Sequence, residues 1–170
     1  MGEIAPPRRL AVEDDRDKFD CGRDSLNNWF RRHAWHNQQS DVSRTSVLAD
    51  SSGGSIAGFV SLSATQIQRG WLPKAAARNK PDPLPAILVG QFAVDLRYQG
   101  QGCATSLMRF ALSTALRIAD EVGCFAVVVH PLDEQACRFY RQFGFKDLPF
   151  DLAGSMAVRI SLLRKNGFAH

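Results

Sequence analysis

The sequence predicts an α/β fold in which helices flank a mixed central sheet of about six to seven strands. The apolar runs Ala86–Val94 and Phe125–Val129 are typical of buried strands, and the amphipathic segment between them, Gly102–Val122, is typical of a helix. A strand–helix–strand order of this kind makes two parallel strands joined by a right-handed crossover. Earlier in the chain, Arg44–Leu48 and Ile56–Ile67 flank a Ser-Ser-Gly-Gly turn, which predicts an antiparallel hairpin and therefore a mixed sheet.

The segment before the hairpin is predicted to be a helix. It begins at Asp24 or Ser25, either of which can cap it, and it ends within Gln38–Asp41. Its apolar stripe has helical spacing and consists of Leu26, Trp29, Phe30, His33 and Ala34. After the hairpin, the polar and proline-rich stretch Arg69–Pro85 is too long for a simple turn. This stretch is either a functional loop or carries a short helix.

The C-terminal part of the chain completes the α/β pattern. A short helix is predicted over Asp133–Phe143, capped by Asp133 and ended by Gly144. The buried stripe of the longer helix before it is predicted to be Leu107, Phe110, Ala111, Ala115 and Ile118. Two closing strands are predicted at Phe145–Phe150 and Met156–Leu163.

Length and composition predict one domain that covers residues 1–170. The chain has 45% hydrophobic and 22% charged residues, which is ordinary for a globular domain. The N-terminal stretch holds charges and prolines, and no segment reaches the roughly 20 apolar residues of a membrane span. We therefore expect a cytoplasmic protein that contacts no membrane. The four cysteines form no C-x-x-C pair and have no histidine cluster beside them, so no metal site is expected.

Basic residues are concentrated in the segment after the hairpin. A net charge of +4 and a pI of about 9.1 are a mild signal for a polyanionic partner. Between Ala64 and Pro81 every charged residue is basic, and these residues are Arg69, Lys74, Arg78 and Lys80. Such a run is either a solvated surface or a contact for a phosphate backbone.

The glycine-rich turn Gln99–Gly102 joins the central strand to the long helix. The first N–H groups of a helix have no partners within it and the helix dipole is positive there, so a phosphate group is stabilised at this position. The segment contains neither G-x-x-x-x-G-K-[ST] nor G-x-G-x-x-G, which argues against nucleotide hydrolysis and against a dinucleotide. The turn is therefore either a phosphate-binding loop or a tight turn that needs two glycines for its backbone.

The run Gln99-Gly100-Gln101-Gly102-Cys103-Ala104 resembles the pyrophosphate-binding signature Q/R-x-x-G-x-G/A of the GNAT acetyltransferase superfamily. The preceding Phe92-Ala93-Val94-Asp95 resembles the strand that leads into this signature. The resemblance implies a GNAT fold with acetyl-CoA as co-substrate. It implies that the backbone amides from Gln101 to Thr105 hold the pyrophosphate, and that the pantetheine arm lies along the strand edge at Phe92 and Val94.

Further segments extend the resemblance over nearly the whole chain, including Phe19–Gly22, Leu26–Trp29, Ile56–Phe59, His130–Asp133 and Phe139–Tyr140. They resemble the acetyltransferase toxins of bacterial type II toxin–antitoxin modules. The resemblance implies acetylation of the α-amino group of aminoacyl-tRNA, which blocks translation, and it implies a homodimer. It also implies a ribbon-helix-helix antitoxin, and contact with operator DNA only through the toxin–antitoxin complex.

Acetyl transfer to an amine requires stabilisation of the thioester oxygen and a proton for the departing thiolate. In GNAT enzymes a tyrosine at the place of Tyr140 donates to the sulfur, so we assign Tyr140 as the general acid. A phenol with a pKa of about 10 is protonated at neutral pH. The alternative role of Tyr140 is packing beside Phe139, Phe143 and Phe145. The backbone N–H of Val94 is our choice for stabilising the oxygen.

Two other groups near this chemistry have alternative roles. His130 ends a buried strand and is either a general base or, as we prefer, an anchor that holds the strand end by hydrogen bonds. Cys103 is at a helix N-terminus, which favours the thiolate, but we expect it to point into the helix–sheet contact rather than to carry an acetyl group. A free α-amino group has a pKa of about 7.7–8.0, so a dedicated base is less necessary than for lysine.

The basic residues are the predicted contact with the tRNA backbone. We expect Arg69, Lys74, Arg78 and Lys80 to hold phosphates of the acceptor stem, with Arg44 as a further candidate. Two other functions remain open. One is a GNAT enzyme that acts on a small-molecule amine or a protein N-terminus, and the other is a coenzyme A-binding regulator without catalysis.

Overall fold

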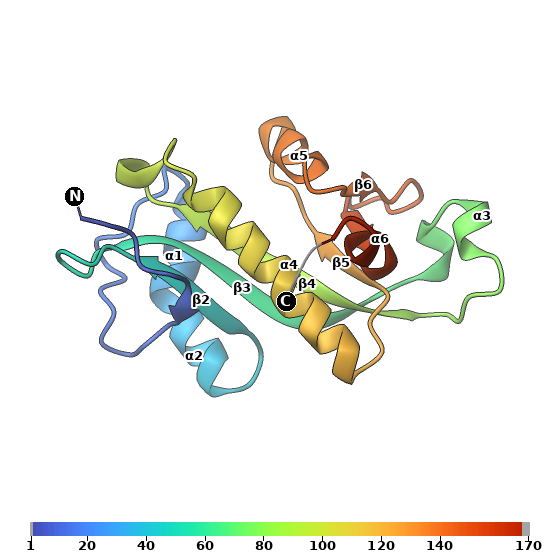
Figure 1. Ribbon diagram of the computed structural model, residues 1–170, viewed down its shortest axis with the longest axis horizontal. Helices are drawn as coiled ribbons and strands as arrows, with labels where there is room; N and C mark the ends of the chain where they lie inside the picture. The colour runs from blue at the N-terminus through green and yellow to red at the C-terminus, as the bar shows by residue number, and fades with distance from the viewer. Residues whose placement is uncertain (1, 168–170) are drawn as a thin grey trace. The chain divides into compact units, whose positions relative to one another are not determined.

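The computed structural model describes residues 2–167, and within them it confirms an α/β fold with a mixed sheet of seven strands (Figure 1). The hydrogen-bonded strand order is β1-β2-β3-β4-β5-β7-β6. The strands are β1 Arg8–Arg9, β2 Arg44–Ala49, β3 Ile56–Ile67, β4 Leu84–Val94, β5 Ala126–Val129, β6 Lys146–Asp147 and β7 Met156–Arg159. The α-helices are α1 Asp24–Arg32, α2 Ala34–Gln39, α3 Lys74–Ala77, α4 Cys103–Glu121, α5 Glu134–Arg141 and α6 Ile160–Lys165, and the 3-10 helices are η1 Arg69–Trp71 and η2 Leu96–Tyr98.

The chain folds as two compact units, which we call unit 1 and unit 2. Unit 1 comprises Met1–Ser63 and Gly90–Ala111, and unit 2 comprises Ala64–Val89 and Leu112–His170. The elements β3, β4 and α4 each continue from one unit into the other. Residue 1 and residues 168–170 of the predicted domain lie outside the described part of the chain.

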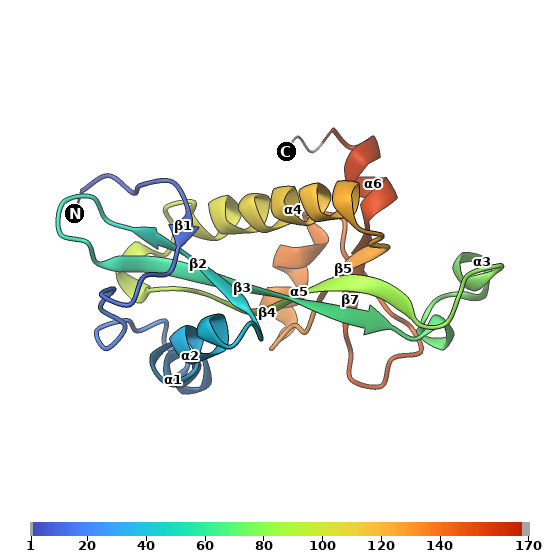
Figure 2. The ribbon, with the colours of Figure 1, turned by 90° about the horizontal axis from the view of Figure 1, so that it is seen from below.

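Unit 1 is built around an antiparallel hairpin. Strand β2 pairs with β3 from Arg44↔Leu62 to Ala49↔Ile56, and β1 pairs with β2 on its other side. Figure 2 shows α1 and α2 on one face of these strands and the beginning of α4 on the other. On the α4 face, a Cβ at Gly58 would lie 2.9 Å from the side chain of Leu107, so glycine permits this close approach.

The aromatic core of unit 1 lies on the opposite face of the hairpin. Phe59 of β3 is fully buried and stacks on Phe30 of α1 with ring centroids 4.3 Å apart. Phe19 contacts both rings edge-on, at 5.0 Å from Phe30 and 5.2 Å from Phe59. Such pairs add to the free energy gained by burial. This cluster fixes the segment before α1 against the hairpin.

Unit 2 contains the parallel strand pair that the sequence predicts. The first part of β4 pairs in parallel with β5, from Ala86↔Ala126 to Val89↔Val129, and α4 is the crossover helix. Strand β7 pairs antiparallel with β5 on one side and with β6 on the other. All four residues of β5 are buried, as expected for a central strand covered on both faces.

The predicted first helix is interrupted. The helix begins at Asp24, but its N-cap is Arg23 and no side chain caps it, so the proposed caps Asp24 and Ser25 are wrong. The exposed His33 separates α1 from α2 and does not belong to the buried stripe. Leu26, Phe30 and Ala34 are buried at intervals of four residues across this break. The spacing of the hydrophobic residues predicts the buried stripe. It does not predict the change of one backbone angle at His33, φ −119°, where α1 ends.

The middle elements agree more closely with the expectations. The stretch Arg69–Pro85 carries the short helices η1 and α3, and its last two residues begin β4. In α4 the fully buried residues are Leu107, Met108, Ala111, Leu112, Ala115 and Leu116, whereas Phe110 and Ile118 are half-buried. The Asp133 cap is confirmed, because its carboxylate accepts the Ala136 N–H at 2.8 Å.

The predicted strand Met156–Leu163 is half wrong. Strand β7 ends at Arg159, and α6 begins at the next residue. Burial alternates from Met156 to Arg159 and then changes to a three-residue interval, with Ile160 and Leu163 buried. That interval is helical and was readable in the sequence. The predicted strand Phe145–Phe150 is reduced to the two residues of β6, because the chain turns after Leu148.

Among residues 2–167, no helix is both long and apolar enough to cross a bilayer.

Candidate active site

The loop between β4 and α4 has the backbone geometry of a helix-terminal anion site. Gly100 and Gly102 have φ angles of 77° and 83°, the left-handed region that favours glycine. A Cβ at either glycine would meet no atom within 4 Å, so backbone conformation, not crowding, requires glycine here. Within the helix, the N–H of Ser106 donates to the carbonyl of Gly102 at 3.0 Å. The N–H groups of the three preceding residues, Cys103–Thr105, therefore precede the helical hydrogen-bond pattern.

The buried carboxylate of Asp95 holds the loop where it leaves β4. Asp95 is 1% exposed and accepts the N–H of Asp20 at 3.0 Å and both the N–H and Nε–H of Arg97 at 2.9 Å. Burial raises the pKa of Asp95, but the hydrogen bonds from Arg97 and Asp20 lower it further, so the net pKa is below its usual value. The Leu96 N–H also donates to the Asp20 carbonyl at 2.8 Å. The end of β4 is thereby fixed to the segment before α1.

A second carboxylate, that of Asp50 directly after β2, fixes the segment that follows β4. The Tyr98 hydroxyl donates to Asp50 Oδ2 at 2.9 Å, and the Gly2 N–H donates to both carboxylate oxygens. The N–H and hydroxyl of Ser52 donate at 2.9 Å and 2.8 Å. These bonds, chiefly those of Ser52, lower the pKa of Asp50 to about 2. Tyr98 is 3% exposed, and the 3-10 turn η2 is therefore fixed in the core of unit 1.

The glutamines of the signature have internal partners. Gln99 Nε2 donates to the Val94 carbonyl at 3.0 Å, which closes the turn between β4 and the glycines. Gln101 Nε2 donates to the Arg97 carbonyl at 3.3 Å. Both side chains thus stabilise the loop itself. The backbone groups of these two residues are what remains for contact with a ligand.

A side chain of β3 contacts the end of β4 before the loop. The backbone N–H of Gln91 donates to the side-chain hydroxyl of Ser61 on β3 at 3.1 Å. Phe92 and Val94 are half-buried, whereas Ala93 between them is buried. The predicted pantetheine contacts Phe92 and Val94 therefore alternate along the strand with a core residue, as the period of a strand requires.

Cys103 is buried beneath the loop, as expected for a residue in the helix–sheet contact. It is 4% exposed, and desolvation raises the pKa of its thiol. Burial therefore disfavours the thiolate at Cys103, in the opposite direction to the effect expected from the helix N-terminus. Ala104 is half-buried and Thr105 is exposed.

Tyr140 lies on α5 in unit 2 and is 7% exposed. Burial raises the pKa of its phenol to about 12, so the hydroxyl is protonated at neutral pH. Its ring is 5.6 Å from the rings of both Phe139 and Phe145. The side chain therefore packs in an aromatic cluster and also retains the proton that a general acid requires.

His130 directly follows β5, also in unit 2. Its Nδ1 lies 2.8 Å from the hydroxyl oxygen of Ser155, and its side chain is otherwise exposed. This hydrogen bond agrees with the expected anchoring of the strand end.

The structure brings together part of the predicted basic set. Arg69 donates to the Lys80 carbonyl at 2.9 Å, and the ammonium group of Lys80 lies 5.7 Å from the centre of the Phe125 ring. The guanidinium of Arg159, which the sequence analysis did not assign, lies at the same distance from that ring. Lys74 and Arg78 are exposed on the same segment. Arg44 belongs to unit 1, where its guanidinium pairs with Asp41 and the Gln38 carbonyl.

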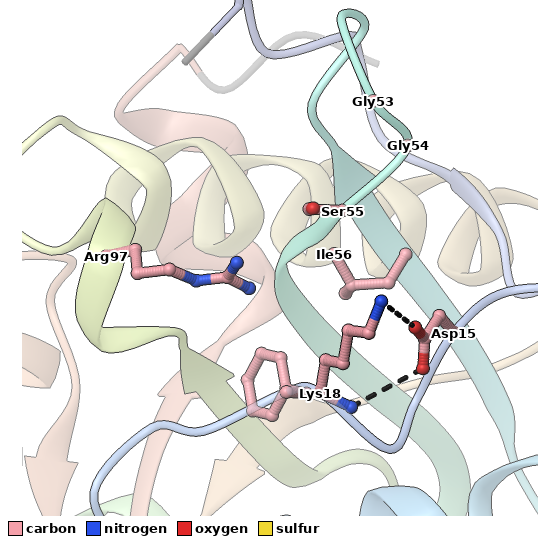
Figure 3. Close-up of a pocket in the computed structure, with 8 residues that line it drawn as sticks. Asp15, Lys18, Gly53, Gly54, Ser55, Ile56 and Arg97 are labelled. Atoms are coloured by element: carbon pink, nitrogen blue, oxygen red, sulfur yellow. Dashed lines mark hydrogen bonds and ion pairs between the residues drawn. The ribbon is translucent and has the colours of Figure 1, made fainter.

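A small pocket in unit 1 is too small to be the coenzyme site. Its volume is about 80 Å³, and its lining residues are Asp15, Lys18, Phe19, Gly53, Gly54, Ser55, Ile56 and Arg97 (Figure 3). Lys18 Nζ is 3.5 Å from the Asp15 carboxylate, so the two charges compensate each other. No group of three or more metal-ligating side chains occurs within the described residues.

Sequence reasoning missed the side chains that support the loop. Asp95 and Arg97 form a short-range turn that the spacing of Asp-x-Arg could have indicated. The contacts of Asp95 with Asp20 and of Tyr98 with Asp50 join residues 75 and 48 positions apart. A pattern of neighbouring residues in the sequence cannot predict contacts between residues so far apart in the chain.

A strand that leads through left-handed glycines into a helix N-terminus is an arrangement that binds phosphate and other anionic groups. Residues 10–145 match the acetyltransferase (GNAT) family, and the chain belongs to this family of acetyl-CoA-dependent acetyltransferases. It is 34% identical to the tRNA-acetylating toxin of Mycobacterium tuberculosis over 151 residues, which are 89% of this chain and 90% of the relative. It is 29% identical to the probable toxin TacT of Sinorhizobium fredii over 157 residues, covering 87% and 84%.

A solved structure described as AtaT complexed with acetyl-methionyl-tRNAfMet has the same fold. The TM-score is 0.89 at 23% identity, with 96% of this chain and 99% of the other covered. The GNAT fold expected from Gln99–Ala104 is therefore confirmed.

The lowered pKa of Asp50 predicts acid sensitivity. A carboxyl whose pKa falls on folding stabilises the native state above its unfolded pKa, and this stabilisation is lost as the pH falls through the folded pKa. We expect the free energy of unfolding to decrease as the pH falls from 3.8 to about 2. Urea unfolding at a series of pH values measures it. Asp50→Asn should flatten this slope and Asp24→Asn, at the exposed start of α1, should not; equal slopes in wild type and Asp50→Asn would contradict the prediction.

Proposed function

We propose that this chain is an N-acetyltransferase toxin of a type II toxin–antitoxin system, acting in the cytoplasm on aminoacyl-tRNA. It transfers acetyl from acetyl-CoA to the α-amino group of the charged tRNA and so blocks translation. The identity of 34% with a tRNA-acetylating toxin, over about nine-tenths of both chains, supports this substrate. The observation that carries the enzymatic part is the left-handed Gly100–Gly102 turn that presents the first amides of α4.

The loop of unit 1 fits the diphosphate of acetyl-CoA. The backbone amides of Gln101–Thr105 hold it, since Gly100 and Gly102 leave open space where side chains would project. Phe92 and Val94 contact the pantetheine arm, and the N–H of Val94 stabilises the thioester oxygen. Acetyl-CoA supplies the activated acetyl group.

Tyr140 is the proton donor to the departing sulfur. Its buried phenol keeps its proton until the thiolate, a far stronger base than the thioester, develops. The aromatic neighbours Phe139 and Phe145 hold the ring in place. Packing and catalysis are therefore compatible at this residue.

The basic residues of unit 2 contact the phosphate backbone of the tRNA. Lys80 and Arg159 both lie 5.7 Å from the centre of the Phe125 ring, and Arg69 donates to the Lys80 carbonyl, while Lys74 and Arg78 are exposed on the same segment as Lys80. Arg44 makes a weaker contribution because Asp41 compensates its charge. The proposal includes a homodimer and a ribbon-helix-helix antitoxin, with operator DNA bound only through the complex of toxin and antitoxin.

The substrate class is tested with radiolabelled acetyl-CoA. We expect label to enter bulk charged tRNA and to be absent from the same tRNA after its amino acids are hydrolysed off. Small-molecule amines and peptide N-termini serve as competing acceptors. Transfer to these acceptors but not to charged tRNA would contradict the proposal.

Tyr140→Phe should keep acetyl-CoA binding and lose most turnover. The substitution removes one hydroxyl and leaves the aromatic packing, so kcat decreases by about 10²–10⁴-fold, the usual contribution of general acid catalysis. Calorimetric titration with acetyl-CoA and a coenzyme A release assay measure the two effects. The other tyrosine of the chain provides the control. Tyr98→Phe should lower the midpoint of thermal unfolding and retain the chemical step, and full turnover in Tyr140→Phe would remove Tyr140 from the mechanism.

Reversing the charges of Arg78 and Lys80 to Glu should abolish tRNA acetylation and spare acetyl-CoA binding. Phosphate contacts release counterions, so wild-type activity on tRNA should also decrease steeply with salt. Arg117→Glu, a matched reversal on α4 within unit 2, should keep activity. Unchanged tRNA acetylation by the Arg78→Glu, Lys80→Glu variant would place the tRNA contact elsewhere.

A further inference from the structure

One aromatic ring of unit 2 lies beside two cationic groups. The Lys80 ammonium and the Arg159 guanidinium are each 5.7 Å from the centre of the Phe125 ring. A cation within about 6 Å of a ring centre is attracted by the negative face of the ring. The two charges come from different parts of the chain, since Lys80 precedes β4 and Arg159 ends β7. Because both charges are within 5.7 Å of one point, they are at most twice this distance apart.

The position of this ring is fixed by the backbone on both sides of Phe125. Its N–H donates to the Pro85 carbonyl at 2.8 Å, and its carbonyl accepts the N–H of Ile160 at 2.9 Å. The side chain is half-buried and packs against a core cluster of unit 2 that includes Leu84 and Ala126. Phe125 is therefore held in place where β5 begins.

The backbone of Lys80 is fixed as well. Its N–H donates to the Ala77 carbonyl at 3.1 Å, and its carbonyl accepts a hydrogen bond from the Arg69 guanidinium at 2.9 Å. Asp82 is the single acid between residues 64 and 89, and its carboxylate accepts the backbone N–H of Arg69 at 2.9 Å. Within residues 2–167 this carboxylate forms no ion pair, so it does not neutralise Lys80 by direct contact.

An aromatic ring holds a cation without cancelling its charge. Elsewhere in unit 2 a carboxylate does the holding, as in the pair of Arg164 and Asp120 at 2.9 Å, and there the negative charge compensates the positive one. In the part of the chain that the structure describes, neither Lys80 nor Arg159 pairs with a carboxylate. These two cations are thus positioned and still carry their full charge, which is the state that suits binding of phosphate groups.

We propose that Lys80 and Arg159 form one binding site for the phosphate backbone of an RNA strand, with Phe125 as the positioning residue that holds both cations. The proposal rests on the proposed function for the identity of the RNA, which is tRNA. Each strand of a nucleic-acid duplex carries one phosphate per roughly 3.4 Å of the helix axis, so neighbouring phosphates fit within the span of the two cations. Side chains that are already ordered lose less entropy when the strand binds.

The first test measures how the binding of deacylated tRNA depends on salt. Each phosphate contact adds about 0.7–0.9 to the slope of the logarithm of affinity against the logarithm of salt concentration. The variant Lys80→Gln, Arg159→Gln removes both contacts, so its slope should be smaller than that of wild type by about 1.4–1.8. Filter binding without acetyl-CoA, at a series of salt concentrations, measures the slope.

The variant Arg117→Gln, Arg164→Gln is the matched control. It removes two charges from exposed positions of α4 and α6 within unit 2, so its net charge equals that of the test variant. Its slope should stay close to that of wild type. An equal decrease of the slope in the control would overturn the site, because the effect would then follow net charge alone.

Phe125→Leu tests the positioning role, because it removes the ring and keeps every charge. The affinity for tRNA should decrease by about fivefold or more, and Phe125→Tyr, which keeps an aromatic face, should retain wild-type affinity. In the Lys80→Gln, Arg159→Gln background the loss of the ring should have no further effect. A merely structural role of Phe125 would give the same loss in both backgrounds, and that result would overturn the positioning role.

The failure of this site is distinct from the failure of the proposed function. Unchanged affinity for deacylated tRNA in the Lys80→Gln, Arg159→Gln variant would overturn the site even if wild type acetylates charged tRNA. Wild-type protein that binds tRNA through these cations and transfers no acetyl group to charged tRNA would instead refute the proposed function.

Discussion

The loop between β4 and α4 depends on the buried carboxylate of Asp95, whose charge must be compensated by hydrogen bonds. An ionised side chain that is 1% exposed is stable only when its oxygens are hydrogen-bonded, and the donors here come from Asp20 and Arg97. Satisfying this charge fixes the segment before α1 and the start of η2 to the end of β4. The helix N-terminus that follows is therefore presented by a rigid backbone, which limits the entropy lost when an anion binds.

The residues proposed for acetyl transfer come from both units. The residues proposed to bind acetyl-CoA, from Phe92 to Thr105, belong to unit 1, and they act mainly through backbone groups. Tyr140, the proposed proton donor, belongs to unit 2 and acts through its side chain. Backbone groups tolerate changes of sequence as long as the glycines remain. The proposed role of Tyr140 instead depends on its own hydroxyl.

The sequence predicted the elements well wherever a short-range pattern encodes them. Strand β3 has the predicted bounds Ile56–Ile67, and Asp133 caps α5 through a contact three residues along the chain. The break at His33 was missed because the buried stripe continues across it. The hydrogen bond from Tyr98 to Asp50 was missed because only the folded chain brings these residues together. The Gly100–Gly102 signature was recognisable since its geometry depends on neighbours in sequence.

The two outermost strands, β1 and β6, each contain only two residues, and all four are exposed. They consist of Arg8–Arg9 and Lys146–Asp147, so both borders of the sheet are short and charged. Borders of this kind disfavour β-augmentation, because an added strand would gain few ladder hydrogen bonds and would face charged side chains. A protein that recognises this chain is therefore expected to bind through side chains on its faces, and the folded chain is protected from edge-to-edge self-association.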